Sequence, residues 1–337
     1  MSAGLYLHIP FCQKRCDYCD FYTMAGRGDL FAPYTAALLH ALDTAPLPRG
    51  SRVDTVYFGG GTPTMLGADR LCTVLEGIRQ RYDLTPDAEI TLEANPIAIT
   101  PKMAAALRQG GFNRISMGLQ SASPTQLRDL GRTHTAEKAA EAVRIVRAAG
   151  FRNLSLDLML GLPHQTVEEV LGSIRFAAEL GAVHLSAYML QLEEGTPYAA
   201  RYTESDIDEE TQRQIYLAAI AELERLGFHQ YEISNFARPG FESRHNLRYW
   251  RCEEYLGVGP AAASCLGGRR FVFPRDIDAF LAAENPWSLC EDEGEADRLA
   301  LELKELNDQR KDMTQQGVDQ AVALVEERYL NDKVLVV

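Results

Sequence analysis

Short apolar runs alternate with amphipathic helical stretches over the first two thirds of the chain, and this alternation limits the fold more than any other feature. Six runs read as strands, at residues 5–9, 53–58, 88–93, 113–119, 153–160 and 183–190. Helical patterns occupy residues 33–42, 68–82, 101–109, 137–149 and 167–180. Short strand–helix–strand connections imply parallel strands with right-handed crossovers. We therefore predict an α/β fold, a partial (βα)6 TIM-like barrel.

The pattern changes near residue 200, after Gly195-Thr-Pro197, where a long helix is expected over residues 209–226. A Tyr- and Arg-rich segment follows that helix. We predict a core barrel over residues 1–200 and a small α+β accessory region over residues 201–290. The remainder, residues 291–337, is predicted to be a shortened or divergent helical segment.

The formal charge of −13 argues against a surface that neutralises phosphate backbones, so nucleic acid is not an expected partner. Cys12 follows the start too closely to leave room for a signal peptide, and no uncharged apolar run of about 20 residues occurs. We expect a cytoplasmic protein with at most peripheral membrane contact.

Polar and glycine-rich residues fall just after the predicted strands. Gly60, Gly61 and Thr62 follow the second strand, and Glu93 and Asp157 are expected at the ends of two others. Ligands of parallel α/β sheets bind at the carboxyl ends of the strands. These residues are therefore predicted to line one mouth, where bare glycine backbone can approach a ligand and carboxylates can accept hydrogen bonds.

Three thiols, Cys12, Cys16 and Cys19, follow the first strand with the spacing CxxxCxxC. A structural zinc site needs four ligands, and no second pair stands at a suitable distance. A [4Fe-4S] cluster held by three thiolates keeps one iron open, and that iron can bind a further ligand. We therefore favour a cluster with an open iron. Four scattered cysteines are expected to be small buried hydrophobes: Cys72, Cys252, Cys265 and Cys290.

With Tyr18 before the third cysteine, this motif resembles the signature of the radical S-adenosylmethionine (radical SAM) superfamily. The resemblance implies that SAM chelates the open iron. It is closest to the coproporphyrinogen dehydrogenase-like branch and extends from Leu5 to about Phe273, through LYLHIPFC, YFGGGTPT, LEANP, ISMGLQS, LDLMLGLPHQT and HNLRYW. Transfer of that branch's SAM contacts, motif by motif, implies Tyr6, Tyr18, Gly60, Gly61, Thr62, Glu93, Gln120, Arg132 and Asp157. His8, close to the cysteine loop, is a candidate supporting residue.

Two members of the branch compete. The dehydrogenases carry another cysteine two residues after the third, whereas this chain reads Cys19-Asp20-Phe21. The haem chaperones resemble it better, because they share CDF and the HNxxYW motif, here His245 to Trp250. In a helix, His245 shares one face with Arg248, Tyr249 and Cys252. The resemblance implies that His245 binds haem, while the residues alone leave open a buried, merely hydrogen-bonded histidine.

We therefore expect a haem chaperone with a [4Fe-4S] cluster and SAM. Its expected partners are haem, haem-accepting proteins and a low-potential electron donor. Two alternatives stay open: a radical SAM enzyme that acts on a porphyrin, as coproporphyrinogen III dehydrogenase or a haem-modifying enzyme, and an iron–sulfur electron carrier. Coproporphyrinogen dehydrogenase activity is not expected. Residues 291–337 depart from the winged-helix-like domain usual in the chaperones, which leaves the role of that segment open.

Overall fold

The computed structural model describes residues 2–295, and one 12-stranded sheet organises this part of the chain. Six strands form its parallel centre in the order β1-β4-β5-β6-β7-β8. Their bounds are β1 Ala3–Ile9, β4 Arg52–Gly60, β5 Asp83–Ala94, β6 Arg114–Gln120, β7 Asn153–Leu160 and β8 His184–Met189. The predicted partial barrel is confirmed.

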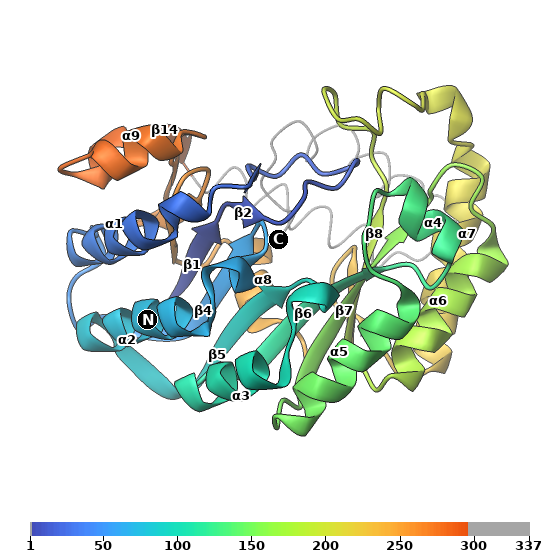
Figure 1. The fold of residues 1–337 in the computed structure, drawn as a ribbon, viewed down its shortest axis with the longest axis horizontal. Coiled ribbons are helices and arrows are strands. Elements are labelled where there is room, and N and C mark those ends of the chain that lie inside the picture. The colour runs from blue at the N-terminus through green and yellow to red at the C-terminus, as the bar shows by residue number, and fades with distance from the viewer. Residues whose placement is uncertain (1, 296–337) are drawn as a thin grey trace.

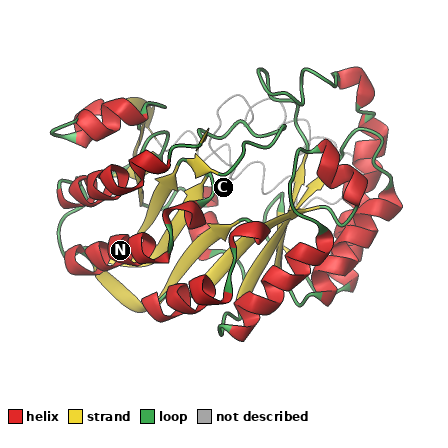
Figure 2. Ribbon diagram, viewed as in Figure 1, coloured by secondary structure: helices red, strands yellow, loops and turns green. Residues whose placement is uncertain are grey.

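The helices that connect these strands lie along the outside of the curved sheet, and the inside faces the cysteine loop (Figure 1, Figure 2). They are α1 Phe31–Asp43, α2 Ala68–Arg81, α3 Pro101–Gly110, α4 Pro124–Asp129, α5 Ala136–Ala148 and α6 Val167–Glu179. Helix α7, Glu209–Arg225, packs beside α6. The six helices predicted before residue 230 are all present, whereas the short helix α4 was not expected. The prediction that the segment from residue 291 is helical was wrong for residues 291–295, which pair with a neighbouring strand, and the rest of that segment lies outside the described residues.

Local sequence explains where these elements begin and end. All seven residues of β1 are buried, as expected for a strand covered on both faces. Helix α6 begins with a capping box, in which the Thr166 side chain accepts from the Glu169 backbone N–H and the Glu169 carboxylate accepts from that of Thr166. Helix α3 ends at Gly111, whose φ of 107° suits glycine.

The chain beyond residue 200 extends the same sheet at both edges. Strands β10 Asn235–Ala237 and β9 His229–Gln230 follow β8, and β10 is antiparallel to it. At the other edge β11 Tyr255–Val258 pairs parallel with β1, and antiparallel strands then follow: β12 Ala263–Leu266, β13 Arg269–Val272 and β14 Glu291–Glu295. The predicted domain division stays a prediction. Residues 296–337 lie outside the described part of the chain.

Several shorter elements complete the described structure. Strands β2 Phe11–Cys12 and β3 Met24–Ala25 pair with each other, and two more helices are α8 Arg244–Trp250 and α9 Ile277–Ala282. Single 3₁₀ turns are η1 Gly28–Leu30, η2 Pro63–Leu66, η3 Pro96–Ala98, η4 Glu204–Asp206 and η5 Pro286–Leu289. Between residues 2 and 295, no helix is both long and apolar enough to cross a bilayer.

Candidate cofactor site in the barrel

A cavity of about 380 Å³ runs through the inside of the barrel, from the cysteine loop to helix α8. Its volume lies in the range of small-molecule sites. Its lining includes Cys12, Cys16 and Cys19 at one end and His245 and Tyr249 at the other. The cavity thus has a mouth, formed by the cysteine loop and the carboxyl ends of the strands, and a floor, formed by α8.

The cysteine loop is tied to the barrel by backbone hydrogen bonds on both sides. Its two ends, β2 and β3, pair in register at Phe11 and Met24. The Asp17 N–H donates to the Leu130 carbonyl over 3.2 Å, and the Asp17 carbonyl accepts from the Tyr198 N–H over 2.9 Å. These hydrogen bonds hold the three thiols over the cavity. None of the three thiols forms a disulfide.

Polar neighbours contact the thiols. The Thr62 hydroxyl lies 3.5 Å from Cys12 Sγ, and Arg132 Nη1 donates to Cys16 Sγ over 3.4 Å. Burial raises the pKa of the Cys12 thiol and raises that of Cys19 to about 12. Cys12 and Cys19 therefore keep their protons at neutral pH in the apoprotein, and iron binding must release them.

No three His, Cys, Asp or Glu side chains within residues 2–295 form a group that could hold a single metal ion. A cubane places a different demand on its ligands, because each of three thiolates binds a different iron. The loop presents that number of thiols at the mouth of the cavity.

The glycine turn after β4 is built as a ligand cradle. The Gly61 N–H donates to the Ile9 carbonyl over 2.9 Å, and the Thr62 N–H donates to the Phe11 carbonyl over 2.7 Å. A Cβ on Gly61 would lie 2.8 Å from the Phe11 carbonyl oxygen, and Gly60 has a φ of 105°. Side chains at these two positions would therefore displace the turn from the cysteine loop.

Two partly buried residues, Glu93 and Asp157, present carboxyl groups to the cavity. Glu93 accepts hydrogen bonds from the Tyr57 hydroxyl over 2.9 Å and from the Gly60 N–H over 3.1 Å. Burial raises its pKa to about 7, and these hydrogen bonds only partly oppose the rise. Asp157 accepts from the Ser116 hydroxyl over 3.1 Å, and burial raises its pKa as well. The expectation that Asp157 lies at a strand end was wrong, because it is the fifth residue of the eight-residue strand β7.

Unsatisfied polar atoms mark the side of the cavity near Gln120. This residue has a φ of 65°, and its buried Oε1 has no hydrogen-bond partner among residues 2–295. Arg132 donates from Nη2 to the Gly118 carbonyl over 2.8 Å, but its buried Nε has none either. A Cβ on Gly118 would contact both side chains. A polar ligand would supply the missing partners.

The structure thus gathers most of the predicted SAM contacts around one cavity. Its lining includes Tyr18, Gly60, Gly61, Thr62, Glu93, Gln120, Arg132 and Asp157. Tyr6 differs, since it lies outside the lining and its hydroxyl is 3.0 Å from His8 Nδ1. The SAM-binding roles of all nine residues stay predictions.

His245 lies on the floor, at the far end of the cavity from the thiols. It is fully buried, with Nδ1 2.8 Å from the Thr55 hydroxyl and Nε2 2.9 Å from the Tyr249 hydroxyl. Its ring also stacks on Tyr57, with centroids 5.4 Å apart. Burial lowers its pKa to about 3. Both ring nitrogens are engaged, so the predicted role of His245 in haem binding would require one contact to break.

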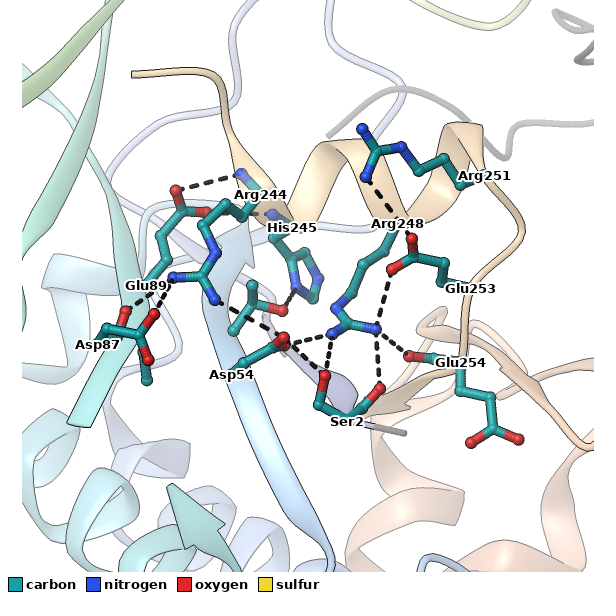
Figure 3. A network of polar contacts seen from close by, with 12 residues as sticks. Ser2, Asp54, Asp87, Glu89, Arg244, His245, Arg248, Arg251, Glu253 and Glu254 are labelled. Carbon is teal, nitrogen blue, oxygen red and sulfur yellow. Dashed lines mark hydrogen bonds and ion pairs between the residues drawn. The ribbon is translucent and has the colours of Figure 1, made fainter. Parts of the chain in front are cut away.

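An ionic network fastens α8 under the barrel (Figure 3). The Glu89 carboxylate accepts from the backbone N–H groups of Arg244 and His245 over 3.2 and 3.1 Å, which caps the helix. Arg248 pairs with Asp54 and donates to the Ser2 carbonyl over 3.1 Å. The motif HNxxYW therefore closes the barrel from below. Cys252, expected on the same helical face, lies beyond the helix with a φ of 48°.

Sequence reasoning missed Arg114 and Tyr57, which both line the cavity. Arg114 is 2% exposed, and its Nε has no hydrogen-bond partner in the described chain. A basic residue that opens a buried strand was the available signal for Arg114. No signal was available for Tyr57, because an aromatic residue in an apolar run is ordinary core.

The donor set fits the group that the motif implies. Three unpaired thiols face a cavity with a bare glycine cradle and unsatisfied polar atoms at its side. Cys12, Cys16 and Cys19 would hold a [4Fe-4S] cluster, and the cavity would hold SAM.

Comparison with known proteins agrees with this geometry. Residues 6–177 match the family model of the radical SAM superfamily. The chain is 40% identical to the haem chaperone HemW of Mycobacterium tuberculosis, over 80% of this chain and 70% of that protein. It is also 40% identical to HemW of Escherichia coli, over 77% of this chain and 69% of the relative. A bovine relative, radical S-adenosyl methionine domain-containing protein 1, mitochondrial, is 40% identical over 77% of this chain and 60% of its own length.

Among solved structures, coproporphyrinogen III oxidase (HemN) of Escherichia coli, described as a radical SAM enzyme, has a similar fold. The TM-score is 0.74 at 27% identity, over 82% of this chain and 68% of that protein. The chain therefore belongs to the radical SAM superfamily, and within it to the family of HemW.

Proposed function

We propose that this protein is a haem chaperone, which binds haem and delivers it to acceptor proteins and carries a [4Fe-4S] cluster and SAM. The observation that carries the proposal is the 40% identity to HemW proteins, over 80% and 77% of this chain. Haem-accepting proteins and a low-potential electron donor are the proposed partners, and the cytoplasm is the proposed location.

Residue roles at the mouth follow from the contacts. Glu93 and Asp157 would accept hydrogen bonds from the ammonium and ribose hydroxyls of SAM, and Gln120 would use its unsatisfied Oε1 in the same way. Arg132, already bonded to Cys16 Sγ, would link the ligand to the cluster through Nε. When bound, the cluster supplies one electron at low potential. The chain's own residues bind and orient SAM and keep water away.

A second candidate is a radical SAM enzyme that modifies a porphyrin. The similarity to coproporphyrinogen III oxidase and the intact cavity favour it. The position two residues after the third thiol weighs against a dehydrogenase. Where the dehydrogenases carry a further cysteine, this loop has Phe21, which is 38% exposed and cannot bind iron.

Anaerobic reconstitution separates the two functions. Haemin added to the reconstituted protein should give a stable complex with a Soret band, and apomyoglobin should then withdraw haem from it. Coproporphyrinogen III should stay unconverted with SAM and reductant. Turnover of coproporphyrinogen, together with no haem complex, would transfer the assignment to the dehydrogenase.

The proposed haem role of His245 has its own matched pair of variants. Tyr249→Phe removes the hydroxyl beside Nε2 and leaves the imidazole in place, whereas His245→Ala removes the imidazole. If His245 ligates haem, Tyr249→Phe should keep or strengthen the Soret complex while His245→Ala weakens it. Equal haem affinity in both variants, with lowered thermal stability, would make His245 a structural residue of the floor.

A further inference from the structure

His8 stands between the two halves of the mouth. It is the penultimate residue of β1, is 4% exposed and does not line the cavity. Its Nε2 lies 2.9 Å from the Tyr22 carbonyl oxygen, three residues after Cys19. Its Nδ1 lies 3.0 Å from the Tyr6 hydroxyl. The imidazole is thus hydrogen-bonded directly to the last residues of the cysteine loop, 19–22, which we call the Cys19–Tyr22 limb.

The two hydrogen bonds fix the tautomer of this ring. A carbonyl oxygen can only accept, so Nε2 must carry the proton that is donated to Tyr22. Burial lowers the His8 pKa to about 4, so the ring is neutral and Nδ1 must accept from the Tyr6 hydroxyl. Arg275 is the charged group whose field also lowers this pKa. Tyr6, His8 and the Tyr22 carbonyl therefore form one directed chain of hydrogen bonds.

The same ring packs against the glycine turn. A Cβ on Gly60 would lie 2.6, 2.7 and 2.9 Å from Cε1, Nδ1 and Nε2 of His8. The ring therefore rests on the Cα of Gly60, whose N–H donates to Glu93. One imidazole touches both the cysteine loop and the cradle predicted to hold SAM.

Further contacts keep His8 from moving aside. The Tyr34 hydroxyl donates to the His8 carbonyl over 2.5 Å. The Tyr22 hydroxyl accepts from the N–H of Ile277, the first residue of α9. The imidazole is consequently a spacer of fixed size between two segments 38 residues apart in sequence, at Tyr22 and Gly60.

We propose that His8 is a positioning residue for the cofactor site: it sets the distance between the Cys19–Tyr22 limb and the Gly60 turn, so that SAM can bridge the cluster and the glycine cradle. The assignment rests on membership of the radical SAM superfamily and is independent of haem delivery. His8 touches neither proposed cofactor, so it acts through the loop and the turn.

Three variants test the spacer. His8→Leu removes both hydrogen bonds, His8→Gln places an amide N–H near the position of Nε2, and His8→Asn places one near that of Nδ1. His40→Leu is the control, because His40, on the exposed face of helix α1, also contacts a carbonyl, that of Glu284 over 2.8 Å. Each protein is reconstituted anaerobically, its iron content is measured, and SAM binding is followed by equilibrium dialysis and by EPR of the reduced cluster.

Loss of one buried hydrogen bond corresponds to roughly a tenfold change in affinity. We expect His8→Leu to bind SAM about tenfold more weakly and to lose the SAM-induced change in the EPR spectrum. His8→Gln should regain most of both, while His8→Asn should not, and His40→Leu should match the unaltered protein.

Two results would overturn the proposal: unchanged SAM affinity and EPR spectrum in His8→Leu, or rescue by asparagine equal to rescue by glutamine. If His8→Leu does not fold, the glutamine and asparagine variants decide the question by themselves. Haem binding is measured on the same samples, so failure of the chaperone function is seen separately.

Discussion

The mouth and the floor of the same barrel use polar residues in opposite ways. At the mouth the three thiols are unpaired with one another, and Gln120 Oε1 and Arg132 Nε have no hydrogen-bond partner in the described chain. On the floor both nitrogens of His245 are engaged, and both Nη atoms of Arg248 are bonded to Asp54, Ser2 and Glu254, so that of this guanidinium only Nε lacks a partner in the described chain. Unsatisfied groups indicate a site that awaits a ligand, whereas satisfied groups indicate a closure.

This contrast shows that two sequence motifs of similar polarity can have different roles, one in a cofactor site and one in closing the barrel. CxxxCxxC lies on a loop whose backbone is hydrogen-bonded to the barrel and whose three thiols form no disulfide. HNxxYW lies on a short helix whose side chains themselves bond the helix to the barrel (Figure 3). Substitutions at the mouth should therefore change cofactor binding, and substitutions on the floor should change stability.

The largest expected effect is at the mouth. Cys16→Ala should reduce bound iron to background after anaerobic reconstitution, because two thiolates cannot hold a cubane. Far-UV circular dichroism should be unchanged, since the thiols carry no backbone contacts of the sheet. Cys72→Ala, at a scattered cysteine on α2, is the control and should keep full iron content. Full iron in Cys16→Ala would refute the three-thiol site.

A large effect on stability is expected on the floor. Arg248→Met removes the guanidinium of a side chain that is only 5% exposed. Asp54 then loses its ion pair with Arg248. Breaking a buried pair in this way costs about 3–5 kcal/mol of the free energy of unfolding. Urea unfolding of the apoprotein measures this loss. Arg251→Met, at the exposed end of the same helix, should cost less than about 1 kcal/mol. Equal effects of the two substitutions would contradict the closure role.

Binding of SAM should depend on pH through Glu93. Its pKa of about 7 means that the carboxylate, the form that attracts an ammonium, is mostly lost at pH 6. We expect affinity to be roughly tenfold weaker at pH 6 than at pH 8, measured by equilibrium dialysis. Glu93→Gln should remove most of this dependence. An unchanged pH profile in that variant would assign the titration to another group.

The raised pKa of Glu93 has the opposite effect on the stability of the apoprotein: low pH weakens SAM binding but stabilises the fold. The pKa of Glu93 is higher in the folded chain than its ordinary value of 4.5, so the native state holds this proton more tightly than the unfolded state. The stabilisation is fully present below pH 4.5 and is lost as pH rises through about 7.

The smallest expected effect concerns the start of α8. Ser243→Ala removes the hydroxyl that accepts from the Asn246 N–H over 3.4 Å, and loss of such a cap costs about 1 kcal/mol. Glu89 still caps the two preceding N–H groups, so the helix should persist. Thermal unfolding measures the loss, and SAM affinity should not change. A weakened SAM affinity would show that the floor is coupled to the mouth.

Local sequence predicted the parallel centre of the fold and the cysteine site. Apolar runs, helix periods and terminal glycines are short-range signals, and β7 was predicted at its observed bounds, Asn153–Leu160. The thiol spacing and the glycine turn were equally local. The sheet edges were not predicted, because β9 to β14 span only two to five residues each and join the sheet only where β10 pairs with β8 and β11 pairs with β1.

The sequence by itself determined that the three thiols and the glycine turn meet at the mouth, because the thiols share one loop after a strand and the glycines share one turn after the neighbouring strand. Only the tertiary structure decided that His245 lies under the barrel with both nitrogens engaged, that Tyr6 points to His8, and that Arg114 reaches the cavity. Those placements depend on contacts between segments up to 190 residues apart, as from Thr55 to His245. Periodicity along the chain carries no information about such contacts.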